Sequence, residues 1–134
     1  MGSNVRSVAT NLESMSEEIA TIRRALEAAE NRHDPSVQID RRDDDRYRRL
    51  PPGRPPMSRR EADESLESLY STGGFSVDWE SDGPIVGTEL AVDSGQFTVT
   101  FDDGNERTGN WLLVYRRDDH GDWRIIRDIY NYID

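Results

Sequence analysis

The hydrophobic positions divide the chain into an N-terminal helical part and a C-terminal part made of strands. From Ser3 to Asp34 there is no Gly or Pro, and apolar residues recur every three or four positions, as in one apolar stripe on a helix. The stripe consists of Val5, Val8, Leu12, Met15, Ile19, Ile22, Leu26 and Ala29. This pattern predicts one long helix that stops before Pro35, or a short helix and a main one, because Ser14 and Glu17 form a second capping signal.

The first part of this stripe is longer than a small domain can cover. A helix lying on a sheet explains the stripe from Ile19 to Ala29, but Val5 to Met15 extends further. We therefore describe residues 1–16 as a helical extension or tail, followed by a single domain at residues 17–134. The extension packs either on its own domain or against a second subunit.

Residues 35–57 form a polar, Arg-rich and Pro-rich segment that we expect to be irregular. Arginine outnumbers aspartate between Asp40 and Arg60, and the run from Pro51 to Pro56 is restricted to extended or turned backbone. Such local basic charge either binds an anionic ligand or an acidic partner face, or it forms a solvated loop neutralised by its neighbours.

The remainder of the chain predicts a short helix and then a meander of strands. Ser58 and Glu61 have the spacing of a capping box, and Gly73 and Gly74 end the helix that follows. Five further stretches alternate or are apolar: Phe75 to Trp79, Ile85 to Asp93, Gln96 to Phe101, Trp111 to Arg117, and Trp123 to Tyr132. Strands joined by short turns pair as an antiparallel sheet, so the fold class is α+β with the N-terminal helices packed on one face of that sheet.

The closing hairpin, Gly109 to Arg117 and Gly121 to Asn131, resembles that of SnoaL-like domains. These are a ketosteroid-isomerase-like branch of the nuclear-transport-factor-2-like superfamily. The Pro51-Pro52 turn and the strand with Phe75 and Trp79 match in the same order. The resemblance implies a curved sheet in a cone-shaped, cystatin-like roll, with a pocket between sheet and helices. It also implies an apolar second helix, whereas Val37 to Arg49 is polar here, so we expect a thinner wall or a partly open pocket.

The resemblance also implies candidate site residues. Ketosteroid isomerases use a carboxylate base with hydroxyl donors beside an apolar slot. The candidates for catalysis here are Asp128 and Tyr130, and those for ligand binding are Trp79, Asp78, Tyr115 and Tyr47.

The face of the sheet that Asp128 occupies decides whether it can serve as a base. Strict alternation places Asp128 and Tyr130 opposite Trp123 and Ile125, on the outer face of the sheet. A β-bulge between these two pairs would reverse that assignment. The alternative for Asp128 is a structural or interface carboxylate paired with an arginine, and for Asp78 it is plain exposure to solvent.

Composition excludes several kinds of site. The chain has no Cys, which rules out disulfides and thiolate metal sites, and the two His residues suggest no metal site and no cofactor. It carries 27 acidic and 17 basic residues, every basic one an Arg, for a net charge of -10. This balance makes nucleic-acid binding an unfavoured function and is typical of an acidic, halophilic protein. No apolar run is long enough to cross a membrane, so we expect a cytoplasmic location.

Two functions are consistent with these patterns. In the first, the domain binds a small apolar ligand in the cone-shaped pocket, either without reaction or with isomerisation of that ligand. In the second, it is a non-catalytic module that forms a homodimer or holds a partner through the sheet face and the N-terminal helix, as kinase-association domains of this fold do.

Overall fold

Three helices and seven strands make up the fold in the computed structural model, which describes the backbone of residues 2–134 and the side chains of residues 11–134. The helices are α1 (Gly2–Asn31), α2 (Ser36–Arg41) and α3 (Arg59–Thr72). The strands are β1 (Arg48–Leu50), β2 (Met57–Ser58), β3 (Phe75–Ser81), β4 (Ile85–Val86), β5 (Leu90–Phe101), β6 (Glu106–Arg117) and β7 (Trp123–Tyr132). None of the helices in the described part is long and apolar enough to cross a membrane.

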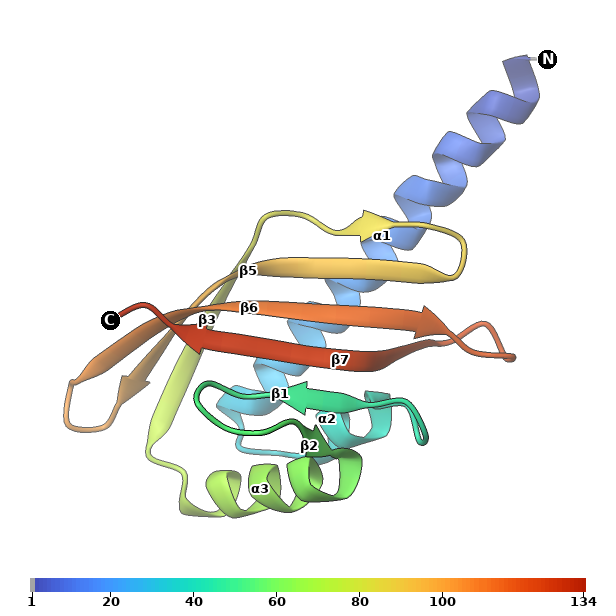
Figure 1. The fold of residues 1–134 in the computed structure, drawn as a ribbon. Helices are drawn as coiled ribbons and strands as arrows, with labels where there is room; N and C mark the ends of the chain where they lie inside the picture. Colours follow the sequence, from blue (N-terminus) through green and yellow to red (C-terminus); the bar gives the residue numbers. More distant parts are fainter. Residues whose placement is uncertain (1) are drawn as a thin grey trace.

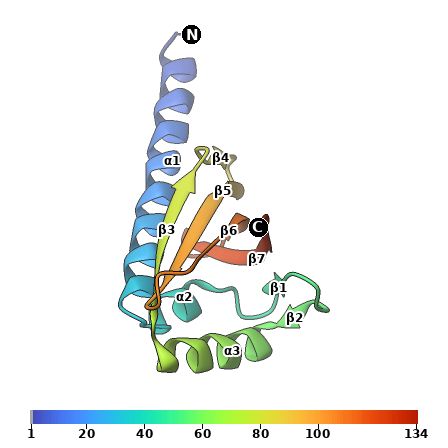
Figure 2. The same cartoon turned by 90° about the vertical axis from the view of Figure 1, so that its left-hand side faces the viewer.

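The strands form one curved, open sheet in the order β2-β1-β7-β6-β5-β3, with β4 paired to β5 (Figure 1). Strands β3, β5, β6 and β7 pair antiparallel, which confirms the predicted meander. Strand β1 adds a parallel edge to β7, so the sheet is mixed rather than wholly antiparallel. The α+β class is confirmed, because the helices pack on the inner face of this sheet, with α1 along one side and α3 across the end (Figure 2).

Helix α1 runs without interruption through the second capping signal at Ser14, as the one-helix alternative predicts. Its described apolar stripe forms much of the core: Met15, Ile19, Leu26 and Ala29 are buried, and Leu12 and Ile22 pack against them. A buried network fixes the helix to the sheet, because Asp93 of β5 accepts hydrogen bonds from Arg23 at 2.8 Å and Ser81 at 2.6 Å. Val5 and Val8 lie outside the residues whose side chains are described, so their predicted contact with a second subunit stays a prediction.

Helix α3 begins and ends as the sequence predicts. The Ser58 and Glu61 side chains each bond the other residue's backbone N–H at 3.2 Å, which completes the capping box. Gly73 follows the last turn with a positive φ of 60°, a conformation that favours glycine. These local signals fix where α3 starts, and they therefore place Leu66 against the core.

The Arg-rich segment at residues 35–57 has more regular structure than its composition indicates. It contains α2, β1 and the start of β2, and it joins the edge of the sheet through the parallel pairing of β1 with β7. Arg42 is almost fully buried and is held by Asp63 and Gln38, which connects α2 to α3. A short helix and an added strand therefore stand where the resemblance implied an apolar second helix (Figure 1).

A β-bulge in β7 changes which residues face the core. Val114 pairs with Arg127, but the next residue, Tyr115, pairs with Ile125, so Ile126 is an extra residue in the strand. Because side chains alternate along a strand, one extra residue returns the following positions to the opposite face. Trp123, Ile125, Asp128 and Tyr130 consequently all face the inside of the cone, which corrects the outer-face assignment that strict alternation gave.

The close approach of β3 to β5 depends on Gly95, where a methyl group would overlap the backbone of Glu80 in β3. We expect Gly95→Ala to lower the free energy of unfolding by about 1–3 kcal/mol, because the neighbouring strand must move to make room. Thr98→Ala, on the outer face of the same strand, is the matched control and should cost about 0.5 kcal/mol or less. Urea unfolding measures both changes, and an equal effect of the two would contradict the close contact at Gly95.

Candidate functional site

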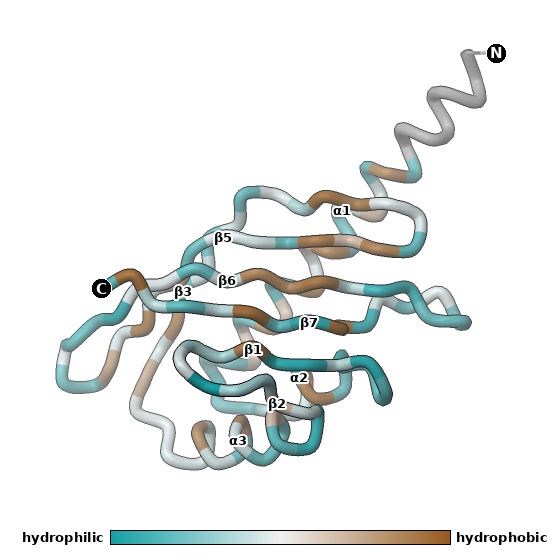
Figure 3. The backbone as a smooth tube through the Cα atoms, in the orientation of Figure 1, coloured by the Kyte–Doolittle hydropathy of each residue, from teal (hydrophilic) through white to brown (hydrophobic). Residues whose placement is uncertain are grey.

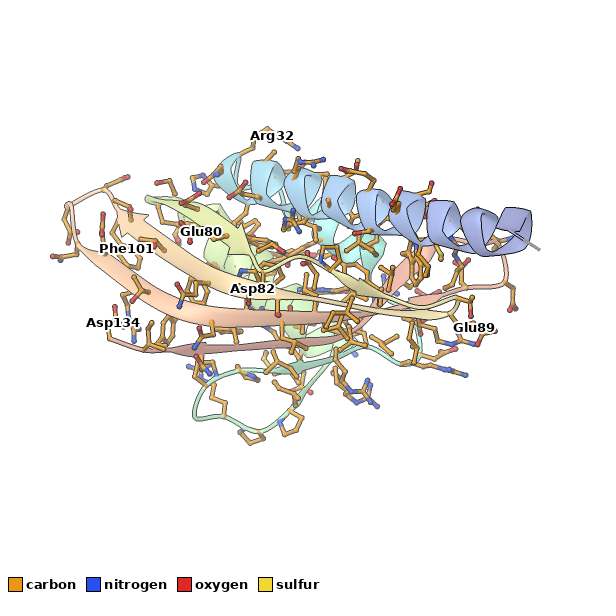
Figure 4. The ribbon with its side chains drawn as sticks, turned by 90° about the horizontal axis from the view of Figure 1, so that it is seen from above. Arg32, Glu80, Asp82, Glu89, Phe101 and Asp134 are labelled. Atoms are coloured by element: carbon orange, nitrogen blue, oxygen red, sulfur yellow. The ribbon has the colours of Figure 1, made fainter. Side chains whose placement is uncertain are left out.

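A pocket of about 210 Å³ lies between the inner face of the sheet and the helices. Its wall is mainly apolar and aromatic, and Trp79 packs on Trp111 with ring centroids 5.4 Å apart. Gly109 leaves room for the Phe97 ring, which a methyl group there would overlap. The exposed lining residues Leu69, Phe101, Arg107 and Tyr132 mark its open end, and Figure 4 shows Phe101 at the end of the sheet where Asp134 also lies.

Asp128 is one of two carboxyl groups that line this pocket. The Tyr47 hydroxyl donates a hydrogen bond to its Oδ2 atom at 3.0 Å, while Oδ1 bonds to no described residue. Arg49 is the direct neighbour of Asp128 in the pairing of β1 with β7, and its guanidinium lies 4.9 Å from the centre of the Tyr130 ring. A carboxylate oxygen, a fixed cation and the Tyr130 side chain therefore lie at one end of an apolar slot.

Glu30 is the second carboxyl group, at the last turns of α1. It accepts hydrogen bonds from the Tyr70 hydroxyl and the Trp79 ring N–H, both at 2.8 Å. Burial raises the pKa of Glu30, and these two hydrogen bonds only partly oppose it. The two carboxyl groups thus differ in surroundings, since Glu30 is held between two aromatic donors and Asp128 has one free oxygen.

Tyr47 and Arg49, beside Asp128, keep their usual charge states. Burial and the nearby Asp128 carboxylate raise the pKa of Tyr47, so its hydroxyl stays protonated as a donor. Burial acts to lower the pKa of Arg49, but Asp128 and the surrounding phenols oppose this and the net direction is upward. The slot therefore holds a permanent positive charge beside a carboxylate.

The structure gathers some of the sequence-predicted residues and separates others. Asp128, Tyr130 and Trp79 line the pocket, and Tyr47 reaches it through its bond to Asp128. Tyr115 is fully buried outside the pocket. Asp78 is exposed and lies on the opposite face of β3, beside a smaller hollow of about 140 Å³.

Two pocket residues were missed by the sequence reasoning, and neither carries a local signature. Glu30 follows the last position of the apolar stripe and looks like one of many acidic residues on a helix surface. Arg49 is one of several arginines in a segment interpreted as a loop. Only the pairing of β1 with β7 brings Arg49 beside Asp128, and such long-range parallel pairing leaves no short-range pattern.

Within residues 2–134, no cluster of three or more His, Asp or Glu side chains is arranged to hold a metal ion. His33 instead packs edge-on against Phe75 and bonds the carbonyl oxygen of that residue at 2.8 Å. His120 is exposed in the turn between β6 and β7.

Comparison with solved structures identifies the architecture. A nuclear-transport-factor-2-like protein with a cystatin-like fold from Novosphingobium aromaticivorans aligns with a TM-score of 0.77 at 17% identity, over 98% of this chain and 90% of that one. The chain has the nuclear-transport-factor-2-like fold. A ketosteroid isomerase-like protein from Erwinia carotovora atroseptica aligns with a TM-score of 0.72 at 22% identity, over 87% of this chain and 94% of that one. No family model and no curated protein matches the sequence.

A superfamily protein from Salmonella enterica gives the same result, with a TM-score of 0.74 at 16% identity over 91% of this chain and 93% of that one. At these levels of identity the likeness establishes the nuclear-transport-factor-2-like fold and no activity. Any function must therefore be argued from the pocket residues of this chain.

The raised pKa of Glu30 predicts a pH dependence of stability. A carboxyl group that binds its proton more tightly in the folded state adds to the free energy of unfolding. This contribution is complete below the unfolded pKa, near the ordinary value of 4.5, and it is lost as pH rises through the folded pKa. Glu30→Gln keeps the shape without a charge, so the variant should gain stability relative to the native chain as pH rises from about 4.5 to about 8. Urea unfolding at several pH values measures this, with Glu64→Gln on the exposed face of α3 as control. A constant difference between Glu30→Gln and the native chain would contradict the raised pKa of Glu30.

Proposed function

We propose that this protein binds a small, apolar, carbonyl-bearing molecule in the cone-shaped pocket and uses Asp128 to move a proton on it. The observation that carries the proposal is the bulge at Ile126, which turns Asp128 from the outer face into an aromatic pocket. The volume of about 210 Å³ suits a ligand of one or two rings. This is the first of the two functions that the sequence suggested.

The chemistry follows from the free oxygen of Asp128. The carboxylate removes a proton from the carbon next to the ligand carbonyl, and the electrons of the broken C–H bond move onto the carbonyl oxygen to give an enolate. Return of the proton from Asp128 to another carbon of the enolate system completes an isomerisation. If the Asp128 carboxyl group first trades its proton for one from the solvent and returns that one to the same carbon, the cycle completes a hydrogen exchange. Tyr47 holds Oδ2 and so directs Oδ1 into the slot.

This proposal predicts a simple proton-exchange activity. With 2-tetralone as probe in D₂O, the native chain should accelerate exchange at the carbon next to the carbonyl, followed by proton NMR above the buffer background. Asp128→Asn should lower the enzymatic rate about a hundredfold or more, the usual contribution of a positioned base. Asp78→Asn removes an exposed carboxylate on the opposite face and should leave the rate unchanged. Exchange at the background rate in the native chain, or the same rate in the native chain and in Asp128→Asn, would overturn the assignment.

We propose the homodimer as a second function of the domain, supported by the outer face of the sheet. Apolar residues from five strands meet there in register, and Ile85 and Leu90 are 75% and 53% exposed. The set comprises Leu50, Ile85, Leu90, Val92, Leu112, Val114 and Ile129. Figure 3 shows hydrophobic stretches along β5, β6 and β7.

Charge on the two sides of this apolar patch favours a second copy as the partner. The β3 side carries the exposed Asp78 and Glu80, and the β7 and β1 side carries Arg127 and Arg48. In a dimer whose two-fold symmetry axis lies along β6, the acidic side of one copy faces the basic side of the other. The same patch is thus complementary to itself.

The dimer proposal is tested by mass. We expect the native chain to elute as a dimer in light-scattering chromatography and Leu112→Glu to elute as a monomer, because a charge enters the centre of the patch. Leu69→Glu, at an exposed leucine of α3 remote from this face, is the control and should remain dimeric. Deleting residues 1–10 distinguishes a contact through the sheet face from one through the helix. If the truncated chain is still a dimer, the contact lies on the sheet, and if it is a monomer, the contact lies on α1.

A further inference from the structure

Strand β3 is the last strand on its side of the sheet, and within residues 2–134 no strand pairs with its outer edge. In an antiparallel pair, the backbone N–H and C=O groups of every second residue point away from the partner strand. An edge that presents such groups to solvent is a template for a strand from another chain, so natural proteins cover it or place charges on it. Figure 2 shows α1 running alongside this edge.

Side chains near the end of α1 occupy the β3 edge in place of a strand. The Asn31 Nδ2 atom donates to the carbonyl oxygen of Val77 at 3.0 Å, and the Asn31 Oδ1 atom accepts from the N–H of Val77 at 2.7 Å. One turn earlier, Oε2 of Glu27 accepts from the backbone N–H of Trp79 at 2.6 Å. The Asn31 amide thus makes with Val77 the pair of hydrogen bonds that a residue of a neighbouring strand would make.

His33 adds a third side chain to this edge from an unfavourable backbone conformation. Its Nε2 atom donates to the carbonyl oxygen of Phe75 at 2.8 Å. His33 lies just after the end of α1 with a φ of 57°, and it is the only non-glycine residue with a positive φ in the part of the chain that the structure describes. Glycine is the usual residue for this conformation after a helix, because it has no Cβ to clash. A histidine at this position accepts that strain and supplies a ring that reaches the edge.

The edge that these side chains occupy is complementary to itself. When two copies of β3 pair antiparallel about Val77, Phe75 of one copy lies opposite Trp79 of the other, and the outward N–H and C=O groups of both meet. The inward side chains of the two strands then remain on one face of a continuous sheet. On the outer face, Asp78 lies opposite Ser76 rather than another carboxylate, so no like charges oppose the pairing.

We infer that Glu27, Asn31 and His33 form a cover that prevents β3 from pairing with β3 of a second copy, and that release of the end of α1 opens this edge. The observation that carries the inference is that three side chains of one segment hold four backbone groups of one strand edge. The surface differs from the outer face assigned to the proposed dimer. A chain that joined copies through both surfaces would grow into open assemblies, and the cover limits that growth.

Removal of the cover is tested in a Leu112→Glu background, where the proposed face contact is already broken. Adding Glu27→Ala and Asn31→Ala removes three of the four bonds and should raise the mass in light-scattering chromatography from monomer to dimer. The far-UV circular dichroism should match that of Leu112→Glu, which shows an intact fold. Asn31→Ala alone removes two bonds and should associate in the same way at higher protein concentration, so it decides the question if the double change does not fold.

Two controls identify the contact. Ser58→Ala in the Leu112→Glu background removes the N-cap of α3 and leaves the β3 edge covered, so it should lower stability without raising the mass. In the uncovered variant, position 76 lies opposite Asp78 of the second copy. Ser76→Arg should therefore tighten the association about two- to fivefold, and Ser76→Asp should weaken it by a similar factor.

An unchanged mass in the folded, uncovered variants at every concentration would overturn the inference. Equal association of Ser58→Ala would also overturn it, because the mass would then follow lost stability. Equal association of Ser76→Arg and Ser76→Asp would exclude antiparallel pairing about Val77. If Leu112→Glu alone has the same mass as the native chain, the proposed face dimer fails, while the change in mass on removing Glu27 and Asn31 still shows whether the edge was covered.

Discussion

One extra residue in β7 determines what the inside of this domain contains. Before Ile126, the strand contributes Trp123 and Ile125 to the core, and after it the strand contributes Asp128 and Tyr130 to the pocket. Without the bulge, either the aromatic core or the polar slot would point outward, because side chains alternate along a strand. The bulge thus lets a single strand contribute side chains to both the core and the pocket.

The helices and the added strand β1 complete what the bulge begins. Helix α1 is fixed by Arg23 on Asp93, and it carries Glu30 to the inner end of the pocket. Strand β1 brings Arg49 beside Asp128. The buried charges that hold the fold together are paired, whereas the guanidinium at the pocket is not.

Much of the fold could be read from the sequence because its signals are local. The alternation of Phe75, Val77 and Trp79, the capping box at Ser58 and the stop at Gly73 depend on neighbours within a few residues. The face of Asp128 could not be read, since Ile126 is an ordinary strand residue with no Gly or Pro to mark a bulge. Arg49 and Glu30 depend on contacts between distant segments, which one sequence does not display.

The central claim is that Asp128 faces the pocket, and the absence of Cys from the chain makes it directly measurable. Single substitutions Asp128→Cys and Ile129→Cys place one thiol on each face of β7, and the rate of maleimide labelling reports access. We expect maleimide to label the thiol at position 128 slowly, and 2-tetralone to slow that labelling further, while labelling at position 129 does not change with 2-tetralone. Protection by 2-tetralone at position 129 with none at position 128 would contradict the inward orientation of Asp128.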